Sequence, residues 1–227
     1  MFADERSQRI IGILSDSFFP ILEAGLTYTI PLTLISFVLG LILAFLTAIA
    51  RLSSFKPIVA LAKFYVWIFR GTPLLVQIFI LFYGLPSVGI TLNPFPAAVI
   101  GFTLNVGAYS SEIIRAAIQS IPKGQWEAAY SVGMSKSQAM RRIILPQSFR
   151  VSIPPLGNSF ISLVKDTSLA ATITVTEMFQ KGQQVASVTY EPLWLYIEVA
   201  FIYLIFSTVL SFIQEKLELR FERGIAK

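Results

Sequence analysis

The chain has 227 residues, of which 55% are hydrophobic and only 14% charged, and its formal net charge is +5. A soluble domain usually carries about 25% charged residues, so this composition indicates a protein whose surface largely meets lipid. The sequence has no Cys and no His, which excludes disulfides, thiolate nucleophiles, histidine acid–base catalysis and the usual zinc ligands. The positive residues cluster between apolar runs, which is typical of a membrane protein and not of a nucleic-acid-binding one.

The first 50 residues predict two helices of different character. Residues 1–18 mix charged side chains with Ile, Leu and Phe, which predicts a short amphipathic helix lying along the membrane surface. An ordinary irregular terminus is the alternative. Residues 24–50 carry no charge and are long enough to cross the bilayer as a first span. Gly40, Ala44 and Ala48 recur there every four residues, a stripe of small residues that favours close helix packing in lipid.

The second and third spans are expected at residues 64–85 and 97–118. The second contains Arg70, followed at 71–73 by Gly-Thr-Pro, where the missing backbone donor of proline predicts either a hinge or a tolerated kink. If the two helices are neighbours, Arg70 lies at the depth of Glu112 and can pair with it. An ionisable residue inside a span is a functional hypothesis by default, and a structural ion pair or a snorkelling arginine is the alternative.

A long polar stretch separates the third span from the last two. It covers residues 122–150 and is followed by a fourth span expected at 151–175, entered through Pro154-Pro155 and interrupted by Lys165-Asp166. A polar connection leads to a fifth span at 192–213 and a charged tail. Because no internal repeat or soluble segment is evident, the sequence predicts a single transmembrane domain over residues 1–227.

The distribution of positive charge predicts how the chain is oriented. Five spans place the two termini on opposite sides of the membrane. Of the 18 Lys and Arg residues, 13 lie after span one, between spans three and four, or in the C-terminal tail, and these regions share one side; three lie on the other. The positive-inside rule therefore predicts an outside N-terminus, with the polar stretch and the C-terminus in the cytoplasm.

A motif in the polar stretch has the composition of a helix that offers a surface to a partner. It reads Glu127-Ala128-Ala129, three residues, Gly133, nine residues, and then Ile143-x-Leu145-Pro146. Alanine is a strong helix former, and glycine ends a helix or admits a partner closely. Trp126 and Tyr130 are four residues apart, so they share a face that could anchor in a groove of the partner. A plain amphipathic loop helix packed on the protein's own spans is the alternative.

This motif resembles, without a substitution, the cytoplasmic loop of permease subunits of ABC importers. The resemblance extends along most of the chain, and its other segments are similar to the polar amino-acid uptake family, which includes histidine, glutamine, arginine and cystine permeases. Those segments are Phe69 to Gln77, Asn105 to Tyr109, Glu112 to Arg115, and Ser162 to Leu169.

The resemblance implies an all-α integral membrane fold of the type I ABC importer permease, with five transmembrane helices and a cytoplasmic coupling helix between spans three and four. It implies a subunit of a prokaryotic cell membrane that forms the path of an amino-acid importer. Its partners would be a second permease copy or paralogue, two ABC ATPase subunits, an extracytoplasmic solute-binding protein and the amino acid. The ATPase would meet the coupling helix at Trp126, Glu127, Ala128, Ala129, Tyr130 and Gly133.

The hydrolysis of ATP is expected on a separate chain. The sequence contains no G-x-x-x-x-G-K-[ST] phosphate-binding loop. ATP and Mg are therefore expected on the partner ATPase, and this chain is expected to bind no cofactor or metal and to be a transport subunit rather than an enzyme.

Polar groups inside the spans are candidates for the substrate path. Lys165 and Asp166 lie from the middle of the membrane towards the outside, and they point about 100° apart on a helix. An amino acid carries an ammonium, which Asp166 can meet, and a carboxylate, which Lys165 can meet. Asn105 and Thr167 would add hydrogen bonds, and Arg70 and Glu112 complete the predicted path. The alternative is that Lys165 and Asp166 contact other spans or the binding protein.

Two other functions compete with an importer subunit. A self-contained ion-coupled amino-acid carrier usually shows internal repeats and broken helices in both halves, and no repeat is evident here. An intramembrane enzyme lacks its chemistry in this sequence, because there is no His, no Cys and no paired acid motif.

Overall fold

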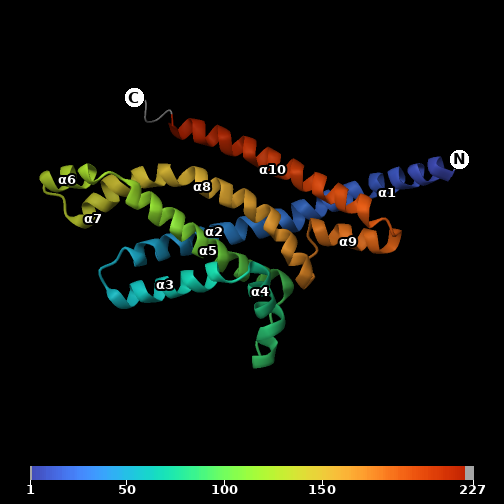
Figure 1. Cartoon of the computed structure of the whole chain (residues 1–227), viewed down its shortest axis with the longest axis horizontal. Helices are drawn as coiled ribbons and strands as arrows, with labels where there is room; N and C mark the ends of the chain where they lie inside the picture. The colour runs from blue at the N-terminus through green and yellow to red at the C-terminus, as the bar shows by residue number, and fades with distance from the viewer. Residues whose placement is uncertain (1, 223–227) are drawn as a thin grey trace. The chain divides into compact units, whose positions relative to one another are not determined.

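The computed structural model describes residues 2–222, with side chains from residue 5 to residue 220, and every regular element in that part is helical. Arg223 and Lys227, which were counted in the C-terminal tail, lie outside the described residues. In chain order (Figure 1) the elements are α1 (Phe2–Ala24), η1 (Gly25–Thr29), α2 (Ile30–Arg51), α3 (Lys56–Gly71), α4 (Leu74–Phe79), η2 (Ile80–Gly84), η3 (Leu85–Val88), α5 (Pro94–Ser120), α6 (Lys123–Ser131), α7 (Lys136–Ala139), η4 (Met140–Ile144), α8 (Leu145–Asp166), η5 (Thr167–Ile173), α9 (Met178–Thr189) and α10 (Pro192–Glu222).

The chain divides into two compact units, and each is described by itself. Helices α2, α5, α8 and α10 contribute residues to both. Unit 1 comprises Met1–Phe37, Leu74–Phe102 and Ile161–Ser211, and unit 2 comprises Val38–Pro73, Thr103–Phe160 and Phe212–Lys227.

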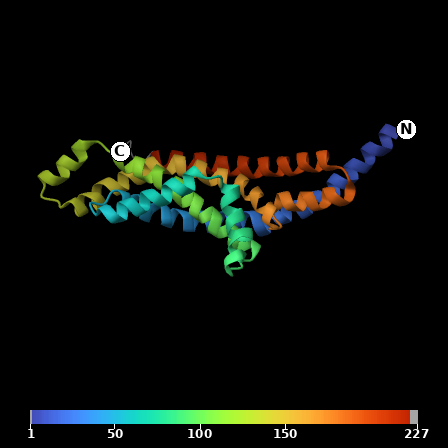
Figure 2. The ribbon, with the colours of Figure 1, turned by 60° about the horizontal axis from the view of Figure 1, so that its bottom comes forward.

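Unit 1 is held together where α9 lies along α1 (Figures 1 and 2) and beside α10. Its core contains Ile21 of α1, Met178 of α9 and two residues of α10, Val199 and Ile202. The helices approach so closely that a Cβ added at Gly182 would lie 2.4 Å from Cγ2 of Val199. Only glycine fits at this contact without displacing its neighbour.

Unit 2 depends on the small-residue stripe of α2. Ala44 and Ala48 are fully buried. A Cβ added at Gly40 would lie 2.6 Å from Cγ1 of Val106 on α5. The prediction that this stripe serves close helix packing is therefore confirmed. Since lipid offers no hydrophobic gain to two apolar helices, such close van der Waals contact is what stabilises their pairing.

Three of the expected spans fall on helices that are candidates for crossing a membrane. Glu5–Arg51, Pro94–Ser120 and Pro192–Arg220 are long and apolar enough to cross a membrane. The expected second span is broken between α3 and α4 at the Gly-Thr-Pro sequence, and it counts only as a bent pair. That makes three spans, or four with the bent pair, within the described residues, so the predicted number of five is not confirmed. The N-terminal amphipathic helix exists, but it is continuous with the first span through η1.

The fourth predicted span differs most from expectation. Helix α8 begins at Leu145, so Pro154 and Pro155 lie inside it and not at its entrance. It ends at Asp166, and the chain continues as the tighter 3₁₀ helix η5 where the sequence predicted more of the same span. Tightening of the last turn is a common way for a helix to end, and the hydropathy pattern does not show it.

Candidate functional site

The helix that carries the Glu-Ala-Ala motif is α6, and Gly133 ends it. The backbone N–H of Met134 donates to the carbonyl of Ala129 at 3.1 Å, and that of Gly133 donates to the carbonyl of Tyr130 at 2.9 Å. This pair of bonds is the Schellman ending of a helix, which needs a left-handed residue after the cap. Gly133 supplies it with a φ of +78°. The predicted helix-ending role of Gly133 is confirmed.

The two sides of α6 have different surroundings. Glu127 and Ala128 are exposed, and the Tyr130 side chain is 46% exposed. Ala129 is buried, and Trp126 packs against the protein's own apolar core. The rings of Trp126 and Tyr130 do share a side, with centroids 6.2 Å apart. The chain itself covers part of the Trp126 ring, so Tyr130 is the more accessible of the two, and anchoring of the rings in a partner stays a prediction.

The core beneath α6 joins segments far apart in the sequence. Its buried members are Ile118 and Ile121 at the end of α5 and Ile144 of η4, and Trp126, Ile49 and Leu52 pack against it. Ile144 and its neighbours, from the Ile-x-Leu-Pro end of the motif, thus form the apolar surface on which α6 packs; we call this surface the seat of α6. The residues between Gly133 and Ile143 allow the chain to turn back through α7 and bring the two ends of the motif together.

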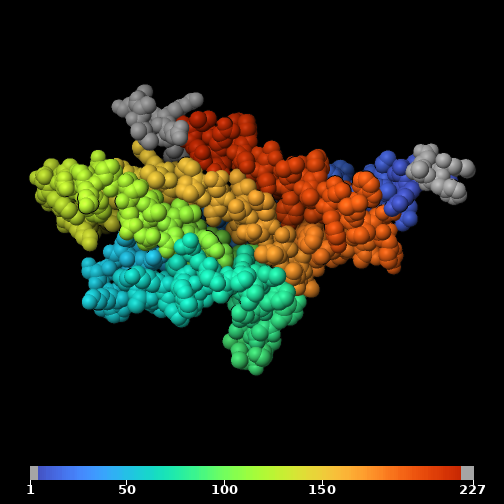
Figure 3. Space-filling view, in the orientation of Figure 1, coloured from blue at the N-terminus to red at the C-terminus, as the bar shows by residue number. Residues whose placement is uncertain are grey.

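The turn back is fixed by a capping box. Ser135 accepts a hydrogen bond from the backbone N–H of Gln138 at 3.3 Å, and the side chain of Gln138 accepts one from the N–H of Ser135 at 2.8 Å. These reciprocal bonds begin α7. In Figure 3 the yellow-green segment of α6 and α7 forms an exposed end of unit 2. Unit 2 therefore presents a short helix on a fixed seat, with Glu127, Ala128 and Tyr130 facing outwards.

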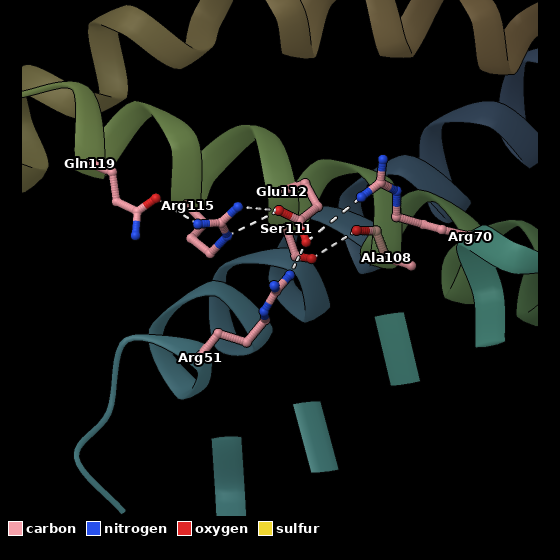
Figure 4. Close-up of polar contacts among 7 residues, drawn as sticks. All are labelled: Arg51, Arg70, Ala108, Ser111, Glu112, Arg115 and Gln119. Atoms are coloured by element: carbon pink, nitrogen blue, oxygen red, sulfur yellow. Dashed lines mark hydrogen bonds and ion pairs between the residues drawn. The ribbon is translucent and has the colours of Figure 1, made fainter. Parts of the chain in front are cut away.

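A charged cluster in unit 2 centres on Glu112 (Figure 4). Arg51, at the end of α2, donates a hydrogen bond to its Oε1. Arg115 donates to Oε2 from Nε at 3.0 Å and from Nη2 at 2.7 Å. Arg70 Nη1 lies 3.7 Å from Oε1. The predicted pairing of Arg70 with Glu112 is confirmed, but two other arginines hold that carboxylate more closely.

Asn105 lies on α5 in unit 2 and contacts the last turns of α3. Its Nδ2 donates to the backbone carbonyl of Phe69 at 3.5 Å, and it is half-buried. Nearby, the hydroxyl of Tyr65 donates to the carbonyl of Leu104 at 2.6 Å. Both bonds tie α3 to α5, so Asn105 joins the two helices that carry Arg70 and Glu112.

The Lys165-Asp166 pair lies in unit 1, at the last turn of α8. Both side chains are exposed. Thr167 is fully buried, and its hydroxyl donates to the carbonyl of Val164 at 2.7 Å. The turn of η5 thus aims the Thr167 side chain into the interior of unit 1, and its predicted hydrogen bond to the substrate stays a prediction.

A cavity of about 510 Å³ opens beside Lys165 in unit 1. Ser168 of η5 and Tyr196, Tyr203 and Ser207 of α10 line it together with Lys165. The Oγ of Ser207 is buried and has no hydrogen-bond partner among the described residues. The cavity thus combines one cation, two phenol rings and a free hydroxyl, which is a suitable lining for a small polar molecule.

The buried carboxylate of Glu177, at the start of α9, fixes one wall of this cavity. It accepts hydrogen bonds from the backbone N–H groups of Phe179 and Gln180, at 2.9 and 2.8 Å, and from the hydroxyl of Tyr203 at 2.5 Å. Burial raises the pKa of the Glu177 carboxyl, and those three donors oppose the rise. In the sequence, Glu177 belongs only to the polar connection before the last span, and nothing in its neighbourhood indicates contact with a residue of that last helix.

Arg51 and Arg115 were not predicted as partners of Glu112, and neither was the contact of the Tyr109 ring with Arg70. The spacing of Glu112 and Arg115, three residues apart on a helix, was a usable indication of their ion pair. Arg51 was counted only as a loop charge. Its contact depends on how α2 packs against α5, which no local pattern encodes.

Comparison with known proteins bears on both regions. Residues 36–223 match the family model described as binding-protein-dependent transport system inner membrane component. The chain is 55% identical over 216 residues to the L-cystine transport system permease protein TcyB of Bacillus subtilis (strain 168), which covers 95% of this chain and 92% of that protein. It is 42% identical over 193 residues to the L-cystine transport system permease protein TcyL of the same organism, covering 82% and 81%.

Two solved structures resemble the fold. One, described as the crystal structure of an amino acid ABC transporter with histidines, matches with a TM-score of 0.86 and 36% identity over 89% of this chain and 95% of that chain. The other, an inward-facing form of the MetNI methionine ABC transporter, matches with a TM-score of 0.68 and 18% identity, covering 94% and 98%. The second likeness concerns the fold alone.

Proposed function

The chain belongs to the family of binding-protein-dependent transport system inner membrane components, and from this premise we infer how it takes part in amino-acid import. It is a permease subunit of an amino-acid ABC importer, a membrane protein with a transport role and not an enzyme. Membership of this family implies an ATPase and a substrate-binding protein as partners. The relatives and solved neighbours give no support to a self-contained ion-coupled carrier.

We propose L-cystine as the substrate. The observation that carries this proposal is the 55% identity, over 95% of the chain, to a protein named as an L-cystine permease. Cystine bears two ammonium groups and two carboxylates. The adjacent, exposed charges of Asp166 and Lys165 suit one ammonium and one carboxylate, and the cavity beside Lys165 has room for part of such a molecule.

We propose that the ATPase docks on the exposed side of α6. Glu127, Ala128 and Tyr130 would form the contact, and the turn at Gly133 would let the partner approach closely. Trp126 and Ala129 would act from the inner side, by holding α6 on its seat. ATP and Mg would bind to the ATPase and not to this chain. The positive-charge distribution supports a cytoplasmic α6 and C-terminus and an outside N-terminus.

The test is uptake of labelled L-cystine into proteoliposomes. The permease is reconstituted alone, with the ATPase, and with both the ATPase and the solute-binding protein. Uptake is expected only from the complete system with ATP. Uptake by the permease alone would overturn the importer mechanism, and uptake of another amino acid in place of cystine would overturn the substrate.

Two variants test the residues. Asp166→Asn should abolish uptake without loss of assembly, with the exposed Asp16→Asn as its control. Glu127→Lys should weaken capture of the ATPase in a pull-down while the chain still inserts, with the exposed Glu215→Lys as its control. Normal uptake by the first variant, or normal capture by the second, would refute the corresponding role.

A further inference from the structure

We propose that Arg70 and Tyr109 form a binding position for the carboxylate of the transported amino acid, and that Arg51 and Arg115 keep this position free by occupying Glu112. The proposal rests on the proposed function as an amino-acid importer. It adds a second carboxylate-binding position to the one assigned to Lys165.

The charges of the cluster do not balance. Of the four ion pairs found among the described residues, three end on Glu112, and they bring three guanidinium groups to one carboxylate. The cluster therefore carries an excess of two positive charges. Because Glu112 and Arg51 are largely buried, with side chains 18% and 15% exposed, water screens that excess less than at an open surface. An anion is favoured beside such a cluster.

Glu112 has little capacity left for Arg70. One of its oxygens accepts the hydrogen bond of Arg51, and the other accepts both donors of Arg115. At 3.7 Å, the Nη1 of Arg70 is beyond hydrogen-bond distance of the nearer oxygen. Figure 4 shows Arg51 and Arg70 reaching Glu112 from other helices, and Arg115 reaching it from the next turn of the same helix, α5. Arg70 is thus attracted to Glu112 without being neutralised by a direct bond.

Arg70 is nevertheless held in place. Its guanidinium carbon lies 5.3 Å from the centre of the Tyr109 ring, which is a cation–π contact. The Arg70 side chain is 44% exposed and Tyr109 is 43% exposed, so a ligand can reach both. Within the described part of the chain the Arg70 guanidinium makes no hydrogen bond. Its planar fork of donors matches a carboxylate, which it can bind through two parallel bonds.

The arrangement predicts a competition for Arg70. If Arg115 is removed, one oxygen of Glu112 loses its partner and can draw Arg70 away from a ligand. If Glu112 is removed as well, nothing draws Arg70 away. The loss in Arg115→Gln should therefore be reversed in the double variant Glu112→Gln/Arg115→Gln. A purely structural role of the cluster predicts the opposite, because the double variant removes more of it.

The experiment measures binding to the purified permease–ATPase complex in phosphatidylcholine nanodiscs, without the solute-binding protein. The labelled probes are L-cystine and L-arginine. The competitors that lack a free carboxylate are the dimethyl ester of cystine and the methyl ester of arginine. The variants are Arg70→Gln, Arg70→Lys, Arg115→Gln and the double variant. Arg150→Gln, an exposed arginine of α8 in the same unit, is the matched control. Size-exclusion chromatography checks assembly.

We expect Arg70→Gln to weaken binding about tenfold or more, since hydrogen bonds to charged groups are the strong ones. Arg70→Lys should be intermediate, because it keeps the charge but loses the fork. Arg115→Gln should bind weakly, the double variant should recover, and the esters should compete poorly. If Arg70→Gln fails to assemble, the comparison of Arg115→Gln with the double variant still tests whether Glu112 competes with the ligand for Arg70.

Three results of the binding measurement would overturn the inference. The first is binding by Arg70→Gln as tight as by the wild type, and the second is competition by the esters as strong as by the free amino acids. The third is weaker binding by the double variant than by Arg115→Gln. Loss of co-purifying phosphatidylglycerol from Arg70→Gln, with amino-acid binding intact, would assign the position to a lipid phosphate and also overturn it. A wild-type complex that binds arginine and not cystine would refute cystine as the substrate and leave the carboxylate inference to stand on arginine.

Discussion

Replacing Gly133 by valine should disable docking at α6 while leaving the spans intact. Gly133 has a φ of +78°, and any residue with a Cβ is disfavoured there by roughly 1–2 kcal/mol, a β-branched residue most of all. No atom lies within 4 Å of a Cβ added at this position, so the penalty comes from the backbone alone. A penalty of that size changes the ratio of well-formed to frayed helix ends by about 5- to 30-fold. Gly133→Asn is the matched control, because asparagine tolerates the left-handed conformation.

The assay is the affinity of the purified ATPase for the permease, measured beside the unfolding temperature. Gly133→Val should bind the ATPase about 5- to 30-fold more weakly, and Gly133→Asn should bind close to the wild-type value. Both should insert and purify normally, because the Schellman turn is at the exposed end of the unit. The reasoning from backbone conformation would be refuted if Gly133→Val bound the ATPase as tightly as the wild type does. It would also be refuted if Gly133→Val and Gly133→Asn bound the ATPase equally well.

Three further predictions concern stability and are checked by thermal unfolding in detergent. Trp126→Ala should destabilise the protein by about 3 kcal/mol, which is the lower end of the range for truncating an aromatic side chain in a core, because the ring is only partly buried. An unchanged unfolding temperature would mean that Trp126 does not hold α6 in place. Gly182→Ala should cost about 1–3 kcal/mol through its clash with Val199, whereas Gly12→Ala, with open space around it on α1, should not destabilise; equal effects would contradict the close packing. The pKa of Glu177 is raised in the folded protein, so the folded protein binds this proton more tightly than the unfolded chain does. The free energy of unfolding of the wild type, relative to that of Glu177→Gln, should therefore fall as pH rises above the usual carboxyl pKa. A relative stability of the wild type that increases with pH would contradict this sign.

Much of the fold follows from local patterns. Helices α2, α5 and α10 lie where long, mainly apolar runs predict spans, because a helix in lipid must satisfy its own backbone. The break after Gly71 follows from Pro73, which has no N–H to donate. The end of α8 was not predictable in this way. Its tightening into η5 depends on contacts of Thr167 and its neighbours in the unit 1 interior.

The sequence by itself determined the class of protein, since its composition indicates a membrane protein and its motifs resemble those of amino-acid importer permeases. It also predicted a short helix at the Glu-Ala-Ala motif, where α6 lies. Only the tertiary structure decided which side of that helix is free. Trp126 and Ala129 face inwards because Ile49, Ile118 and Ile144 meet beneath them, and long-range packing of this kind leaves no trace in a local pattern. The same holds for Glu112, whose partners Arg51 and Arg70 come from α2 and α3 and reach it only when those helices pack against α5.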